Sequence, residues 1–103
     1  MLRREAKNFI LYGPPSVSET GEESRRVLGM IRAAVSFRSA EERAEDGVLL
    51  AAETAAALIP ARYTPPGGFR RGMQIADGNH LYEMQTPVNL GRRWAVKCVR
   101  IHV

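Results

Sequence analysis

Apolar and polar residues alternate along the last third of the chain, in three runs separated by turn residues. We predict strands over Gly72–Ala76, His80–Val88 and Arg92–Val103. Asp77-Gly78 lies between the first two runs and favours the positive φ angles that a tight hairpin needs. Asn89-Leu90-Gly91 offers a second turn of the same kind. This end of the chain therefore predicts a small, β-rich domain.

The last of these strands changes the face on which its apolar residues lie. Large apolar residues occupy even positions from 94 to 98 and odd positions from 99 onward; they are Trp94, Val96, Cys98, Val99, Ile101 and Val103. Because a strand alternates faces with a period of two, the change indicates a bulge or burial on both faces. Either is typical of a strand that bends around a closed barrel or is covered by another layer.

The first third of the chain predicts two more strands and a polar connection. Asn8–Tyr12 is a short apolar strand, which Gly13-Pro14-Pro15 ends because proline cannot donate to a ladder. Ser16–Ser24 is polar and acidic and predicts a long exposed loop or hairpin tip. Val27–Arg38 contains a clear alternation that predicts a strand with one buried and one wet face.

The middle of the chain predicts a helix. Ser39 and Glu42 match a capping box, in which the two side chains satisfy backbone groups at a helix start. An apolar stripe with helical spacing follows, formed by Val48, Ala52, Ala55 and Ile59. We predict a helix from about Ala40 to Ala56 that covers the sheet.

After the predicted helix, Leu58–Thr64 predicts a strand in which Pro60 requires an edge position or a bulge. Pro65–Gly68 is a turn-rich linker. The predicted fold class is mainly β: one domain over residues 1–103, a small barrel or sandwich of about six strands with one inserted α-helix at about 40–56. The predicted core residues are Ile10, Ile31, Val35, Phe37, Leu49, Ile75, Tyr82, Met84, Trp94, Val96 and Val99.

Composition adds a basic balance and little else. The 103 residues carry a net charge of +4, with a sequence pI of about 9.8. This balance favours polyanions or an acidic protein neighbour, although the arginines are scattered. The adjacent pairs are Arg3-Arg4, Arg25-Arg26, Arg70-Arg71 and Arg92-Arg93.

No catalytic, cofactor-binding or metal-binding motif emerges, so we expect a protein that is not an enzyme. His80 and His102 lack metal-ligand spacing, and the single cysteine, Cys98, is expected to be a small core residue. The acidic residues Glu19, Glu22 and Glu23 are typical of a solvated loop. No apolar run reaches membrane-spanning length and no secretory signal is evident, so we expect synthesis in a reducing cytoplasm.

The order of elements resembles the small head-tail joining proteins, known as stopper or head-closure proteins, of long-tailed bacteriophages and gene-transfer particles. The resemblance spans nearly the whole chain, through short and degenerate elements. The segments that carry it are Phe9–Tyr12, Ile31–Phe37, Ser39–Glu42, Arg62–Thr64, Gly72–Ile75, Asp77–Met84 and the apolar terminal strand.

The resemblance implies a virion protein of the neck, made in the bacterial host. It implies a ring, on the order of six or twelve copies, between portal or adaptor proteins above and tail-completion or tail-tube proteins below, with DNA passing through. Interaction residues are then expected in two polar loops, Ser16–Arg26 and Thr64–Arg71, both mobile until docked. They are Ser16, Glu19, Glu22, Glu23, Arg25, Arg26, Pro65, Pro66, Arg70 and Arg71. Residues expected to face the channel or DNA are Arg70, Arg71, Arg92 and Arg93.

Two other classes stay open at this stage. One is another ring protein of the phage tail, such as a tail-completion or terminator protein. The other is a small nucleic-acid-binding barrel, which needs exposed aromatic side chains on one sheet face with basic neighbours. Tyr82 and Trp94 are the candidates for such stacking, but both lie within apolar alternations that predict core positions.

Overall fold

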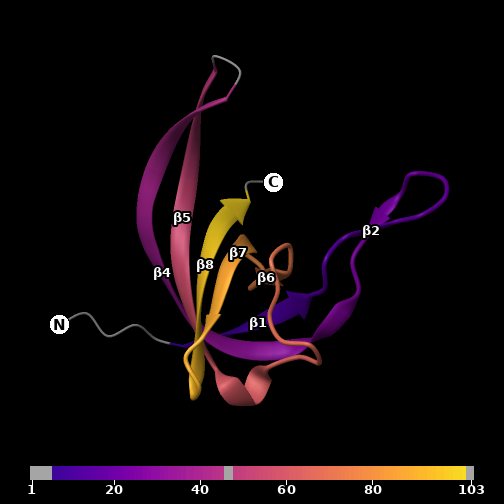
Figure 1. Cartoon of the computed structure of the whole chain (residues 1–103), viewed down its shortest axis with the longest axis vertical. Helices are drawn as coiled ribbons and strands as arrows, with labels where there is room; N and C mark the ends of the chain where they lie inside the picture. The colour runs from indigo at the N-terminus through magenta and orange to yellow at the C-terminus, as the bar shows by residue number, and fades with distance from the viewer. Residues whose placement is uncertain (1–5, 46–47, 102–103) are drawn as a thin grey trace.

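A computed structural model describes the backbone of residues 6–45 and 48–101, and the side chains of these residues except over 37–52. Its main feature is a closed antiparallel barrel with the strand order β1-β4-β5-β8-β7-β6 (Figure 1). The barrel strands are β1 (Lys7–Tyr12), β4 (Val27–Glu45), β5 (Val48–Pro60), β6 (Gln74–Ala76), β7 (Leu81–Asn89) and β8 (Arg93–Ile101). The prediction of a small β-barrel is confirmed.

Two short strands and one 3-10 turn complete the described chain. β2 (Ser16–Val17) and β3 (Glu23–Ser24) form a separate two-stranded hairpin between β1 and β4. The 3-10 helix η1 (Ala61–Tyr63) follows β5. Our prediction of a single strand over Leu58–Thr64 is therefore wrong, because β5 ends at Pro60 and η1 follows it. Proline at a strand end leaves no ladder bond unmade.

The barrel interior is filled by alternate residues of its strands, as a period of two requires. In β1, Phe9 and Leu11 are each only 2% exposed and Ile10 is 39% exposed. Our choice of Ile10 as a core residue was therefore wrong by one position in register. A run of adjacent apolar residues does not show which of its two faces turns inward.

Most of the other predicted core residues do line the interior. Ile31, Ile75, Met84 and Val96 are buried, while Val35, Tyr82 and Trp94 are partly buried and pack against the same cluster. Val99 is half-buried. The side chains of Phe37 and Leu49 lie outside the described part of the structure.

The predicted helix at 40–56 is wrong, because β4 and β5 continue through these positions as an antiparallel pair. Pairs run from Ala34 and Leu58 to Glu45 and Val48, with a bulge near position 38. Beyond the barrel, residues 39–45 pair only with the facing part of β5, whereas β1 pairs with β4 up to Ala33. We call residues 39–45 of β4 and 48–53 of β5 the β4–β5 arm; Figure 1 shows these two strand segments projecting from the barrel.

Both turns predicted in the C-terminal third are present. Gly78 and Gly91 have φ angles of 94° and 92°, which residues with a Cβ rarely adopt. The Asp77 carboxylate accepts hydrogen bonds from the backbone N–H groups of Asn79 and His80, at 2.9 and 2.7 Å. These local side-chain bonds explain why the turns were visible in the sequence.

The phase change in the last strand corresponds to burial on both faces. Beyond Cys98, Val99, Arg100 and Ile101 are all half-buried. The register shift lies in the neighbouring β7, between Met84 and Thr86, while β8 keeps a regular register with β5. Of the two predicted explanations, two-sided burial therefore applies to β8 itself.

Closure of the barrel depends on one of its two shortest seams. β1 and β6 join through three residue pairs, from Ile10 with Ala76 to Tyr12 with Gln74. By contrast, β5 and β8 share seven pairs, from Thr54 with Val99 to Pro60 with Arg93. The residues that follow this short seam on either side, Gly13 and Gly72, are the ones that the N-terminal hairpin contacts.

Candidate assembly surface

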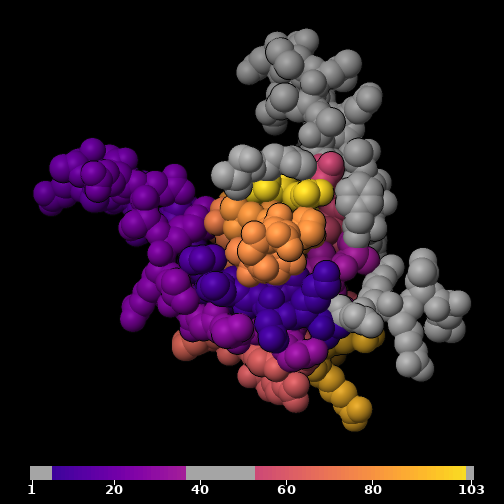
Figure 2. Space-filling model, turned by 180° about the vertical axis from the view of Figure 1, so that it is seen from behind, coloured from indigo at the N-terminus to yellow at the C-terminus, as the bar shows by residue number. Residues whose placement is uncertain are grey.

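The hairpin formed by β2 and β3, residues 16–24, projects away from the barrel (Figures 1 and 2). Every residue from Ser16 to Ser24 is exposed. Its turn is closed by Ser18, whose backbone N–H donates to the Glu22 carbonyl at 2.9 Å and whose Oγ accepts from the Glu22 N–H at 3.1 Å. The predicted exposed loop or hairpin tip is thus a hydrogen-bonded hairpin.

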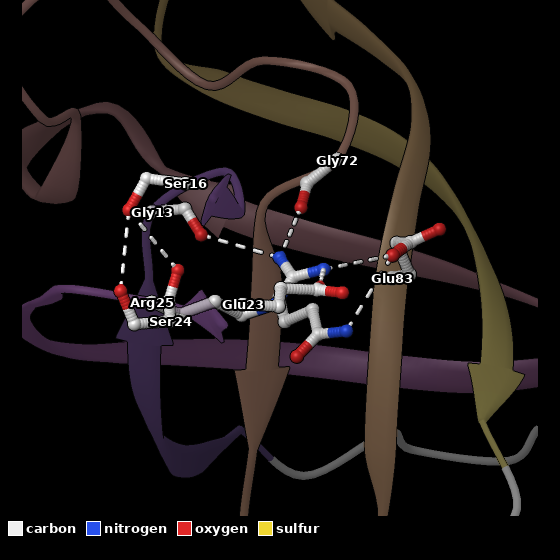
Figure 3. Close-up of polar contacts among 8 residues, drawn as sticks. Gly13, Ser16, Glu23, Ser24, Arg25, Gly72 and Glu83 are labelled. Atoms are coloured by element: carbon white, nitrogen blue, oxygen red, sulfur yellow. Dashed lines mark hydrogen bonds and ion pairs between the residues drawn. The ribbon is translucent and has the colours of Figure 1, made fainter. Parts of the chain in front are cut away.

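The base of this hairpin is held to the barrel by Arg25. Its Nη1 donates to the carbonyl oxygens of Gly72 at 2.6 Å and Gly13 at 3.2 Å, and its Nη2 lies 3.3 Å from Glu83 Oε1 (Figure 3). Glu23 Oε1 lies 3.7 Å from the same Nη2. With only 16% of its side chain exposed, Arg25 makes charge-assisted bonds that water weakens little.

Arg25 and Arg26 therefore have different roles, although both were predicted as interaction residues. The Arg26 side chain is exposed, and its guanidinium has no hydrogen-bond or ion-pair partner among the described residues. Only its backbone is engaged, through a 2.8 Å bond from Gly13 N–H to its carbonyl. Arg25 is an internal anchor, whereas Arg26 keeps its donors available for another molecule.

The second predicted loop, Thr64–Arg71, is held along its length by apolar contacts. Phe69 is 4% exposed and meets the Trp94 ring edge-on, with 5.2 Å between the centroids. The indole Nε1 of Trp94 donates to Thr64 Oγ1 at 2.8 Å. Pro65 is buried as well. These anchors argue against our expectation that the loop is mobile in the free domain.

Close packing also fixes the conformation of this loop at Gly68. A Cβ on Gly68 would lie 3.2 Å from Trp94 Cη2, and its φ is +83°. The preceding Gly67 has a similar φ of +82° but open space around its Cα. Glycine is thus favoured at position 67 only by the positive φ angle. At position 68 it is favoured by the positive φ angle and by the close approach of the Trp94 ring.

The two loops meet at one groove, which brings five of the predicted interaction residues together. This groove, of about 610 Å³, is lined by Gly13, Pro14, Ser16, Arg26, Val27, Leu28, Pro65, Pro66 and Arg70. Val27 and Leu28 are 59% and 41% exposed, which is unusual for large apolar side chains. We call it the loop groove. Neither Val27 nor Leu28 was among the predicted interaction residues, because both belong to the predicted strand Val27–Arg38.

The remaining predicted residues lie elsewhere on the surface. Glu19 and Glu22 are exposed in the hairpin turn, and Arg71 is exposed just before β6. Arg92 and Arg93 are exposed at the turn between β7 and β8, beside η1, where Ala61 N–H donates to the Arg92 carbonyl at 3.0 Å. The assignment of Arg70, Arg71, Arg92 and Arg93 to a DNA channel stays a prediction.

A second, more polar hollow of about 730 Å³ lies on the other side of the Arg25 anchor, between the hairpin base and the β6–β7 turn. Its lining includes Tyr12, Glu23, His80 and Arg100. His80 Nδ1 lies 3.4 Å from Asp77 Oδ2 and Arg100 Nη1 lies 3.2 Å from Glu53 Oε2, so these charges face partners within the chain. Nothing in this lining forms a nucleophile with its base.

The described residues include no group of three or more metal-ligating side chains. Burial raises the pKa of the Cys98 thiol to about 12, so this cysteine stays protonated and unreactive at neutral pH. His102 lies outside the described residues. Among the helices of the described chain, none has the length and apolar character to cross a membrane.

Two solved structures share this fold over nearly their full length. One is a chain from the "Virion of native gene transfer agent (GTA) particle", with a TM-score of 0.68 and 16% identity, covering 96% of this chain and 98% of that one. The other is protein xkdH of the phage-like element PBSX of Bacillus subtilis, with a TM-score of 0.54, 13% identity and 96% coverage of both chains. No family model and no curated protein matches the sequence.

Proposed function

We propose that this chain is a structural virion protein of a phage-type neck: a ring-forming stopper that closes the DNA-filled head below the portal and adaptor and provides the surface for tail attachment. The observation that carries the proposal is the end-to-end fold similarity to a chain of an assembled gene-transfer-agent virion. Mutual coverage of 96% and 98% means that the similarity extends over nearly the whole of both chains and is not limited to a short common motif.

The surface supports an assembly role rather than a reaction. A ring of identical copies requires projections on one side of each subunit and receiving surfaces on another. This chain has two projections, the β2–β3 hairpin and the β4–β5 arm, and the loop groove between Pro14 and Arg70.

Passage of DNA fits the distribution of charge and aromatic residues. The exposed guanidinium groups of Arg26, Arg70, Arg71, Arg92 and Arg93 have no partner within the described chain, so they are available to attract phosphate without reading bases. The two aromatic side chains that a nucleic-acid-binding barrel would use for stacking are only partly exposed and pack against the core cluster. Tyr82 packs edge-on against Phe9 and Trp94 against Phe69. We therefore favour the virion role over a nucleic-acid-binding module.

The direct test shortens the hairpin in the particle. Replacing Ser18–Glu22 by Asn-Gly keeps the β2–β3 pairing and forms a tight two-residue turn, so the barrel stays folded. Particles carrying this change are expected to lose packaged DNA or fail to join tails, measured by electron microscopy and infectivity. A matched control, Glu19→Ala with Thr20→Ala, keeps the hairpin length.

Two outcomes would count against the proposal at different levels. Normal infectivity of the shortened variant would remove the hairpin from the mechanism. Absence of the protein from purified particles would refute the virion role itself. In vitro, DNA binding is expected to be weak, independent of sequence and steeply salt-dependent, and tight binding that persists at high salt would favour the nucleic-acid module instead.

A further inference from the structure

We propose that the β2–β3 hairpin, residues 16–24, of one copy docks in the loop groove of a second copy, so that hairpin and groove form a contact between neighbouring subunits. This inference rests on the ring in the proposed function and names two surfaces that would join it. It follows from the apolar lining of the groove, the two arginines within that lining, and the acidic hairpin that projects from the same chain.

The apolar lining of the loop groove is produced by a β-bulge. In the β1–β4 ladder, Leu11 pairs with Gly29, and the next residue of β1 pairs with Val27. Leu28 is therefore an extra residue in β4, which interrupts the alternation of faces. As a result the consecutive side chains of Val27 and Leu28 both line the groove, with exposed fractions of 59% and 41%. A regular strand would turn one of the two inward.

Two arginines add positive charge to this apolar lining. Arg26 and Arg70 both line the groove and are exposed, and neither guanidinium has a hydrogen-bond or ion-pair partner among the described residues. Their backbones are held in place, because Gly13 N–H donates to the Arg26 carbonyl at 2.8 Å and Met73 N–H donates to the Arg70 carbonyl at 3.2 Å. The groove therefore suits a segment that combines an apolar side chain with carboxylates.

The β2–β3 hairpin has this combination. Residues 16–24 contain three of the eleven acidic residues of the chain and none of the fifteen basic ones, which gives −3 within a chain of +4. Glu23 lies 3.7 Å from Arg25 of its own chain, but the side chains of Glu19 and Glu22 have no ion-pair partner in the described part of the chain. Val17 is 69% exposed and supplies the apolar side chain. Charge and polarity of the hairpin thus complement those of the groove.

The hairpin tip lies apart from the groove of its own chain. Figures 1 and 2 show the hairpin projecting away from the barrel, whereas the groove lies at the hairpin base, where Ser16 is the one residue of 16–24 in its lining. The bonds between Ser18 and Glu22 keep the tip in its hairpin form. A projection and a receiving surface at different places make a head-to-tail contact, which closes into a ring when the rotation allows it.

Charge reversal tests this contact in the purified full-length chain. The wild type is expected to self-associate with a Kd below about 1 mM at low salt, measured by sedimentation velocity. The hairpin variant Glu19→Lys/Glu22→Lys and the groove variant Arg26→Glu/Arg70→Glu should each associate at least about tenfold more weakly. The combined variant, with all four substitutions, has the net charge of the wild type and should associate like it, because each reversed hairpin then meets a reversed groove.

Two controls separate this contact from general charge effects. Arg92→Glu/Arg93→Glu makes the same charge change as the groove variant at another exposed turn, and should associate no more weakly than the wild type. Glu19→Ala/Thr20→Ala keeps Val17 and Glu22, and should weaken association by less than about fivefold. Circular dichroism spectra of all the variants check that each one is folded.

The proposal is overturned by a wild type that stays monomeric, by unchanged association of either charge-reversed variant, or by a combined variant that stays dissociated. A groove variant that loses only DNA binding would assign the two arginines to nucleic acid and would overturn it too. Because the assay uses the purified chain alone, its failure is distinguishable from failure of the virion role, which is tested by the presence of the protein in purified particles.

Discussion

The two polar loops that the sequence presents as equivalents are attached to the barrel by different physics. The hairpin at 16–24 touches the barrel through its base, where the guanidinium of Arg25 binds two carbonyl oxygens and a carboxylate. The loop at Thr64–Arg71 is attached along its length by Phe69, Pro65 and the Trp94 indole. Because the hairpin is attached only at its base, we expect its tip to move more than the second loop, which is attached along its length. We therefore expect one wall of the loop groove to be more adjustable than the other.

The largest effect is expected from removing the apolar anchor. Trp94→Ala deletes the ring behind Phe69 and Gly68 and the bond to Thr64, and should destabilise the domain by about 3 kcal/mol, the lower end for a large aromatic because Trp94 is partly exposed. Urea unfolding monitored by circular dichroism measures it. A loss below about 1 kcal/mol would show that the loop does not depend on this ring.

Removing the polar anchor should cost less. Arg25→Ala leaves Glu83 and two carbonyl groups without their charged donor, for an expected loss of about 2 kcal/mol and a more mobile hairpin. The neighbouring Arg26→Ala is the matched control, and should change stability by less than about 0.5 kcal/mol because its side chain has no partner in the described chain. Equal effects of the two substitutions would contradict the division between anchor and free arginine.

The rigidity of the second loop can be tested with two glycines in sequence. Both Gly67→Ala and Gly68→Ala place a side chain at a positive φ, which should destabilise the fold by about 1 kcal/mol in each case. Only the added Cβ at position 68 would also contact the Trp94 ring, at 3.2 Å. Gly68→Ala should therefore destabilise by about 1 kcal/mol more than Gly67→Ala. In a Trp94→Ala background this difference should vanish, and its persistence would mean that the ring is not the cause.

The β6–β7 turn adds a titratable anchor and the smallest expected effect. Burial raises the pKa of the Asp77 carboxyl, but bonds from the Asn79 and His80 N–H groups and the His80 ring outweigh it and hold the pKa below its ordinary 3.8. The folded pKa is thus the lower one, so the ionised carboxylate stabilises the fold above pH 3.8 and this contribution is lost as pH falls through the folded pKa.

The variant Asp77→Asn keeps an acceptor oxygen and removes the titration. Wild type should be more stable than this variant at pH 7 by less than about 1 kcal/mol, and the difference should shrink in acid below the folded pKa. Paired urea midpoints at neutral and acid pH measure the change. A difference that does not depend on pH would show that the charge of Asp77 contributes nothing.

The parts of the fold that local chemistry determines were predictable from the sequence. Asp77-Gly78 and the turn ending at Gly91 specify their own backbone geometry, so the strands on either side followed. The apolar alternation from Ile31 to Val35 likewise identified the start of β4 correctly. In each case the signal and the structure it specifies lie within a few residues of each other.

The helix prediction failed because it used only residues within one segment, whereas the structure of that segment depends on pairing with a distant strand. Ser39 with Glu42, and the stripe through Ala52 and Ala55, satisfy helix rules within one segment. The structure pairs Thr54–Pro60 with β8, some forty residues away, and buries Ala55, Ala57 and Ile59 in alternation. That period-two pattern was the available signal, hidden because alanine fits either element.

The candidate surface was predictable as a set of loops but not residue by residue. Nothing within the Arg25-Arg26 pair shows which arginine turns inward, because the choice depends on Gly13, Gly72 and Glu83 arriving beside it. The arm was missed entirely, as a consequence of the helix prediction. Long-range register, rather than local composition, therefore decides which polar residues are free to act.

The seam of three residue pairs between β1 and β6 closes the barrel, and we call this seam the clasp. Its residues are more than sixty positions apart, so the loop that it closes is the longest in the fold, and we expect it to form last in folding and open first. Arg25 extends the clasp by binding Gly13 and Gly72 just past its last pair. With the clasp open, β1 and β6 become bare edges that can pair with another chain. By holding Gly13 and Gly72 together, the single guanidinium of Arg25 is therefore expected to protect the chain from strand exchange.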